Sequence, residues 1–204
     1  MQRKYTLLLV AFCLGVAAGF AQSSTKGNTP QKSCSFAFNS INQFGLLTGE
    51  RGPAVAVQSI NGFRYKTWFA GAGIGLDSYK DITVPLFLDV RKYLWDKTST
   101  PFVYADGGYH FLMDNTDKKW GTITKYKGGL YYDVGFGYKL TLKAKQALLL
   151  STGYSFKELT ENQYSDLSLV DIVWANGWNG RRDGFIEGYK YRLNRWSFKV
   201  GLQF

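Results

Sequence analysis

Alternation of apolar and polar residues with a period of two recurs over most of this chain and is the feature that most limits its fold. Side chains of a β-strand point alternately to opposite faces, so the pattern predicts strands with two different faces rather than helices. Turn residues separate the segments, which are about ten residues long, as strands that cross a membrane are. We predict eight strands, at roughly Ser40–Thr48, Pro53–Asn61, Lys66–Asp77, Ile82–Tyr93, Pro101–Leu112, Lys127–Lys139, Gln146–Phe156 and Tyr191–Phe204.

The last predicted strand shows the alternation most clearly. Every second residue from Trp196 to Phe204 is apolar, and the residues between them, with Arg195, include two cations. A soluble barrel would point the apolar face inward, whereas a membrane barrel would point it outward to lipid. This strand alone therefore does not decide between the two.

Glycines on two other strands favour the membrane barrel. In Lys66–Asp77 and Lys127–Lys139, glycines occupy alternate positions of one face, and the opposite face is apolar. Glycines that face a narrow lumen leave space for large polar side chains, whereas a glycine-lined outer surface has no evident use. The sequence therefore predicts an all-β, antiparallel, up-and-down transmembrane β-barrel of eight strands.

The same alternation places several charged residues on the inward face. Eight strands leave room only for packed side chains, and buried charges must be paired or hydrated. We therefore expect a salt-bridge network that fills and stiffens the lumen. Its predicted members are Asp89, Arg91, Asp106, Asp133, Lys139, Arg195 and Lys199.

The N-terminus predicts export. Arg3 and Lys4 precede the apolar segment Thr6–Phe20, and small residues allow cleavage after Ala21. We expect residues 1–21 to be a signal peptide, 22–39 a flexible lead-in and 40–204 the barrel domain. With the parity of the connections below, this indicates the outer membrane of a Gram-negative bacterium. Cys34 is then the single remaining cysteine, which excludes an internal disulfide.

The lengths of the connections between strands support an outer-membrane location. With both ends of the barrel in the periplasm, alternate connections face outward and tend to be long. The two longest, Met113–Tyr126 and Lys157–Lys190, have that parity. We favour an extended loop for the second, although Leu167–Trp174 followed by Asn176-Gly177 could add a hairpin and make ten strands. In the connection Lys157–Lys190, the candidates for binding a surface ligand are Trp174, Trp178, Arg181 and Arg182.

Aromatic residues collect at the predicted strand ends. Amphipathic rings favour the headgroup depth of a membrane, which predicts two aromatic girdles. The periplasmic girdle is expected to include Trp68, Tyr93, Trp95 and Phe102, and the outer one Tyr109 and Phe111.

Little in the sequence points to chemistry. Asp89 and Asp106 could form an acid–base pair, but no nucleophile or substrate pocket accompanies them. His110 is the only histidine and is expected to be a polar rim residue bonded to a neighbour. No phosphate loop and no metal-ligand spacing occurs, so we predict no cofactor and no metal.

Several stretches resemble the small outer-membrane β-barrel proteins of the OmpA- and OmpX-like type, which have eight strands. They are Ile60–Tyr65, Val84–Arg91, Pro101–Tyr109 and Tyr191–Trp196. The resemblance implies a location and an architecture rather than an activity. It also implies that the alternating C-terminus is the signal read by the barrel-assembly machinery during insertion. The residues of this signal would be Trp196, Phe198, Val200, Leu202 and Phe204.

These observations predict a non-enzymatic protein that acts as an envelope scaffold or as a surface-binding module through its outer loops. Its net charge of +10 suits anionic lipid headgroups and the phosphorylated sugars of lipopolysaccharide, rather than nucleic acid in an exported protein. Two alternatives remain open at this stage: a narrow, porin-like passive channel, and an enzyme that modifies lipid A with His110.

Overall fold

The computed structural model describes residues 36–49, 52–78, 82–114, 116–119, 122–142, 146–165 and 184–204. Within these ranges the regular structure consists of strands, and none of these residues forms a helix long and apolar enough to span a membrane. The strands are β1 (Phe36–Thr48), β2 (Ala54–Tyr65), β3 (Trp68–Ser78), β4 (Ile82–Tyr93), β5 (Ser99–Leu112), β6 (Thr116–Lys119), β7 (Thr122–Lys127), β8 (Leu130–Thr141), β9 (Ala147–Ser165) and β10 (Gly184–Gln203).

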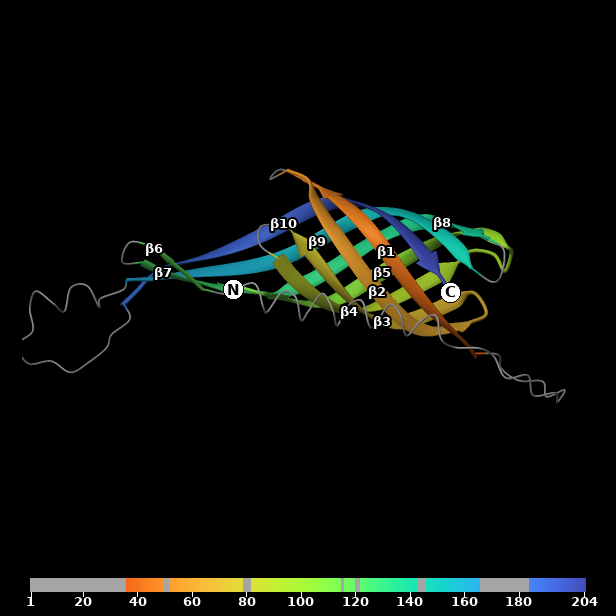
Figure 1. Cartoon of the computed structure of the whole chain (residues 1–204), viewed down its shortest axis with the longest axis horizontal. Coiled ribbons are helices and arrows are strands. Elements are labelled where there is room, and N and C mark those ends of the chain that lie inside the picture. The colour runs from red at the N-terminus through yellow and green to blue at the C-terminus, as the bar shows by residue number, and fades with distance from the viewer. Residues whose placement is uncertain are drawn as a thin grey trace, which may run out of the picture.

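Eight of these strands form a closed antiparallel barrel, which confirms the predicted fold class. Their order is β10-β1-β2-β3-β4-β5-β8-β9, and β9 pairs with β10 to close the ring (Figure 1). Each barrel strand pairs with the barrel strands that precede and follow it in the chain, so the topology is up-and-down. The β6–β7 hairpin belongs to the connection between β5 and β8, which pair directly with each other. The β1–β10 register runs from Ile41 opposite Gln203 to Thr48 opposite Trp196. Two backbone hydrogen bonds between Ser40 and Phe204, of 3.1 and 2.9 Å, extend this junction to the last residue.

The strands extend beyond several predicted boundaries. β1 begins at Phe36, opposite Tyr65 of β2, so the last four residues of the predicted flexible lead-in belong to the sheet. The predicted connection Lys157–Lys190 begins within β9 and ends within β10. Lys157 lies opposite Leu193, and Lys190 lies opposite Thr160. Continuous cross-strand hydrogen bonding explains both extensions, because each added residue satisfies its backbone groups against an existing strand.

The connection Met113–Tyr126 was predicted as a loop but contains the β6–β7 hairpin. Thr116 lies opposite Lys125, and β7 then pairs with β9 from Thr122 opposite Ser165 to Lys127 opposite Thr160. The sheet therefore has ten strands, of which eight form the closed barrel and two, β6 and β7, lie outside it. The two additional strands come from this connection, whereas the hairpin considered at Leu167–Trp174 lies outside the described residues.

The strands β6, β7, β9 and β10 form a sheet that projects from one end of the barrel (Figure 1). The C-terminus lies at the opposite end, with the short connections β2–β3, β4–β5 and β8–β9. The two longest connections, between β5 and β8 and between β9 and β10, thus join strands at the end opposite the C-terminus, as the parity argument predicted, whereas β1–β2 and β3–β4 at that end are short.

The glycine-containing faces of the strands point into the lumen and the apolar faces point outward, as predicted. Along β10, Phe198 is 54% exposed on the outer surface, whereas the adjacent Lys199 is 4% exposed inside. Gly73 faces the lumen, where a Cβ atom would lie 2.5 Å from ring carbons of Phe87. A glycine is therefore required at this position by the packing of a large inward ring.

Aromatic side chains fill much of the lumen. Phe69, Phe87, Tyr104 and Tyr131 belong to one buried cluster with Ile41, Ile60 and Leu149. Tyr93 and Phe102 also belong to it and are 0% and 1% exposed, so their assignment to the periplasmic girdle was wrong. Tyr93 has the same parity as Arg91 and Asp89 on β4, and this parity places all three inside. Trp68 and Trp95 are exposed, at 51% and 54%.

Candidate functional site

The interior of the barrel holds buried charged side chains together with the aromatic rings. All seven residues predicted for the lumen network are buried, with exposed fractions of 8% or less. They come from β4, β5, β8 and β10, whose inward positions meet across a lumen that is only a few side chains wide.

Arg91 and Asp89 form the first pair. The two residues are separated by one position on β4, so both point inward. Arg91 Nε and Nη2 donate to the Asp89 carboxylate at 2.9 and 2.8 Å, a two-point contact that fixes the guanidinium plane. Arg91 Nη2 also donates to Gln43 Oε1 of β1 at 3.4 Å, and Gln43 Nε2 donates to Gln58 Oε1 of β2 at 2.5 Å. Gln58 Nε2 in turn donates to Tyr131 Oη of β8 at 3.0 Å. The pair thereby connects to the opposite wall.

Lys199 is the centre of the second group. Its ammonium nitrogen lies 2.9 Å from Asp133 and 3.3 Å from Asp106, which are opposite each other on β8 and β5. Tyr104 Oη donates to Asp133 at 2.8 Å, and Ser197 Oγ donates to the same carboxylate at 3.3 Å. One cation thus compensates two carboxylates that are paired across neighbouring strands.

Sequence reasoning missed a third ion pair, between Lys157 and Asp77. The Lys157 ammonium also donates to Thr83 Oγ1 at 3.0 Å, and Thr83 Oγ1 donates to Asp77 at 2.6 Å. Both ionic side chains are nearly inaccessible, at 1% and 3%. Lys157 was assigned to a loop because the predicted strand ended at Phe156, nine residues before the end of β9 at Ser165. Its parity with Ser155 and Gly153 on β9 would have placed it inside.

Two predicted members lie away from these groups. Lys139 Nζ lies 5.2 Å from the centre of the Tyr93 ring, a cation–π contact at the end with the short connections. Arg195 Nη1 donates to the Gly52 carbonyl oxygen at 3.1 Å, between the strands and the β1–β2 connection. The groups around Arg91 and around Lys199 adjoin where Asp89 and Asp106 lie opposite each other, whereas Lys139 and Arg195 contact other partners.

His110 is buried inside the barrel rather than exposed at its rim. It is 1% exposed, and Nε2 lies 2.6 Å from the Glu158 carbonyl oxygen, to which it donates in the matching tautomer. The predicted bond to a neighbour is therefore present. The Asp89 and Asp106 side chains face each other across β4 and β5, and each is engaged by a cation.

The projecting sheet carries mostly polar and tyrosine side chains. Lys190 forms an ion pair of 3.1 Å with Glu158, and Lys125 Nζ lies 4.8 Å from the Tyr164 ring centre. Tyr189 Oη donates to the Glu187 carboxylate at 2.5 Å, and this bond raises the pKa of Tyr189. The predicted ligand-binding residues Trp174, Trp178, Arg181 and Arg182 lie outside the described residues.

The predicted assembly signal forms the outer face of the closing strand. Trp196, Val200 and Leu202 are 58%, 50% and 43% exposed, and Phe198 lies on the same face. Phe204 follows β10 and joins β1 through its backbone bonds to Ser40. In the described part of the chain, no group of three or more His, Cys, Asp or Glu side chains could hold a metal ion.

Neither a protein-family model nor a curated protein sequence matches this chain. The resemblance to OmpA- and OmpX-like proteins therefore stays a prediction.

Proposed function

We propose that this chain is a non-enzymatic protein of a bacterial outer membrane, in which the barrel is the membrane anchor and the projecting sheet binds a surface partner. The observation that carries the proposal is the inverted arrangement of the barrel, with apolar side chains outside and ionic side chains inside.

The outer surface supports insertion into lipid. Large apolar residues on every barrel strand are 36% or more exposed, such as Leu88 at 67%, Phe136 at 64% and Phe198 at 54%. Removing one such side chain from water is worth about 1.5–3 kcal/mol, so leaving this surface in water would be costly. Soluble proteins rarely expose apolar patches of more than a few hundred Å², whereas a membrane barrel needs an apolar band around its whole circumference.

The interior supports a scaffold rather than a channel. Lys199 of β10 pairs across the lumen with Asp106 of β5 and Asp133 of β8. The Arg91–Asp89 pair of β4 and the aromatic cluster occupy the interior with them. Small solutes would have to displace these paired charges and rings. Breaking one buried pair costs about 3–5 kcal/mol, which is a large barrier to passive flow.

The projecting sheet supports a binding role. Pairing between β1 and β10 ends at Trp196, and β10 continues toward Gly184 with β9 as its partner on one side. Such strand edges can bind an extended segment through backbone hydrogen bonds. The cations Lys118, Lys125, Lys127 and Arg192 on the same sheet suit phosphorylated sugars such as those of lipopolysaccharide.

The membrane part of the proposal is tested by fractionation and by gel mobility. The protein should be recovered with outer membranes, and it should migrate differently in SDS before and after boiling, because a closed barrel has no free edge from which to unfold. Recovery in the soluble fraction with identical mobility before and after boiling would contradict membrane insertion.

The binding part is tested by shortening the connection between β9 and β10. Replacing residues 166–183 with a short Gly-Ser turn should leave the mobility shift intact, because no barrel strand is removed, and should weaken binding to lipopolysaccharide. A second variant, Lys125→Glu, should weaken binding without shortening the chain, and Lys97→Glu at the opposite end is its matched control. Binding should fall as salt rises, because the Debye length is only about 8 Å at physiological ionic strength. Unchanged binding by both variants would favour a purely structural barrel.

A further inference from the structure

The apolar outer surface of the barrel is interrupted on β1, β2 and β3. Here consecutive outward positions in the middle of each strand hold small or polar residues, in contrast to the Leu, Val, Phe and Tyr side chains on the outer faces of β4 and β8. The register makes the interruption continuous, because Asn42 lies opposite Ser59, Ser40 opposite Asn61, and Asn61 opposite Ala72. We call this area the β1–β3 patch; it consists of Asn42, Ser59, Asn61, Ala70 and Ala72, and Ser40, which is 6% exposed, lies buried at its edge.

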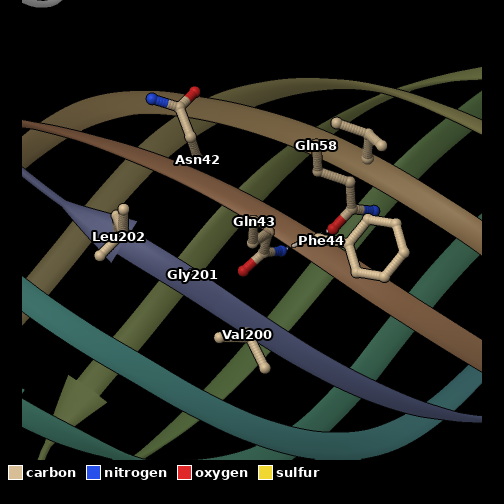
Figure 2. A pocket seen from close by; sticks show the side chains of 8 residues that line it. Asn42, Gln43, Phe44, Gln58, Val200, Gly201 and Leu202 are labelled. Atoms are coloured by element: carbon tan, nitrogen blue, oxygen red, sulfur yellow. Dashed lines mark hydrogen bonds between the residues drawn. The ribbon is translucent and has the colours of Figure 1, made fainter.

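Large apolar side chains surround the β1–β3 patch. Phe44, Phe63, Ile74 and Leu202 are 43–59% exposed at its borders, so the small residues lie lower than their surroundings. A pocket of about 480 Å³ opens beside Asn42 (Figure 2). In Figure 2, Asn42 and Phe44 of β1 lie beside Val200 and Leu202 of β10, with Gln58 of β2 close by. The pocket borders the patch at Asn42, and apolar side chains of Phe44, Val57, Val200 and Leu202 form much of its lining.

Polar groups at this position are poorly matched to lipid. Asn61 is exposed on the outer surface, and Asn42 Oδ1 is buried without a hydrogen-bond partner among the described residues. Lipid tails offer no hydrogen bonds, so polar side chains at hydrocarbon depth favour contact with another protein. Small residues at such a contact allow two backbones to approach closely.

From this arrangement we propose that the β1–β3 patch is the contact between two copies of this chain, side by side in the membrane. The inference rests on the proposed membrane location. All copies in one membrane have the same orientation, so a two-fold axis along the membrane normal brings the same patch from each copy together. Asn and Ser side chains both donate and accept hydrogen bonds, so the patch is complementary to itself across such an axis.

Cysteine cross-linking in outer membranes tests the contact. In a Cys34→Ser background, Asn61→Cys should yield a covalent dimer on mild oxidation, because residues near a two-fold axis meet their own copies. Val134→Cys is the matched control: it is 44% exposed on β8, four strands from β2 in either direction around the barrel. The control should remain largely monomeric. Equal amounts of dimer from both variants, or none from Asn61→Cys, would overturn the proposal.

A second variant tests the hydrogen bonds themselves. The double change Ser59→Val and Asn61→Leu removes two polar groups from each copy and keeps the surface apolar, so the barrel should still fold and shift on gels. Energy transfer between labelled copies in vesicles should report a dimer weakened roughly threefold to tenfold, since such bonds are modest in membranes. A dimer as stable as that of the unmodified protein would overturn the proposal.

The outcomes also separate the two proposals. A chain that is recovered with outer membranes and shifts on gels, but remains monomeric, overturns the dimer and leaves the proposed function standing. A chain that does not enter the membrane overturns the proposed function first.

Discussion

Replacing Lys199 with methionine tests whether the charges inside the barrel stabilise it as a unit. The change keeps much of the length of the side chain and removes the only ammonium within 4 Å of both Asp106 and Asp133 among the described residues. At an effective dielectric constant of about 20, contacts of 2.9 and 3.3 Å correspond to gross attractions of about 6 and 5 kcal/mol. The two carboxylates would then repel each other across β5 and β8.

The measured loss should be smaller than this gross attraction. Desolvation of the ammonium opposes it in the unmodified protein, and the variant can bind a proton on one carboxylate instead of leaving both charged. We therefore expect the free energy of unfolding to fall by about 3–5 kcal/mol, the usual result of removing one partner of a buried ion pair. Adding Asp133→Asn to the variant should recover part of that loss.

The assay is urea unfolding of the refolded protein in lipid vesicles, followed by gel mobility without boiling and by tryptophan fluorescence. The matched control is Val200→Met, which introduces the same residue on the outer face of β10, where Val200 is 50% exposed. It should change the free energy of unfolding by no more than about 0.5 kcal/mol. If Lys199→Met unfolds at the same urea concentration as this control, the lumen pairs do not stabilise the barrel and the reasoning fails.

Three further changes follow from the packing. Gly73→Ala should destabilise the barrel by about 1–3 kcal/mol, because its Cβ would lie 2.5 Å from the Phe87 ring, whereas Gly107→Ala, whose Cβ meets nothing within 4 Å, should be nearly neutral; equal urea midpoints for the two would contradict this account. Phe204→Asp should sharply reduce the amount of protein recovered in outer membranes, because it places a charge at the end of the closing strand; a normal amount on immunoblots would show that the C-terminus is misinterpreted. His110→Ala should leave the lipid A composition of the host unchanged, because the ring is 1% exposed inside the barrel and bonded to Glu158; altered lipid A in mass spectra would revive the enzymatic alternative.

The amino-acid sequence by itself determined the faces of the strands. Parity alone assigns Phe198 to the outside and Lys199 to the inside, because side chains alternate strictly along an extended backbone. The same parity places Tyr93 and Lys157 inside. Tyr93 was misassigned because aromatic residues at strand ends were taken to lie at the membrane interface, and Lys157 because the predicted strand ended at Phe156. The eight strands and the end at which each connection lies also follow from local periodicity and from counting.

Only the tertiary structure decided which inward residues meet. Lys199 on β10 contacts Asp106 on β5 and Asp133 on β8, and these strands are not all neighbours in the ring. Such contacts depend on the tilt and stagger of the closed barrel, which no local pattern encodes. The β6–β7 hairpin has the same origin, because Thr122–Lys127 becomes a strand by pairing with an extended β9 that the sequence does not reveal. Alternation is a property of one strand, whereas pairing across a lumen or along a projecting edge is a property of several strands held together.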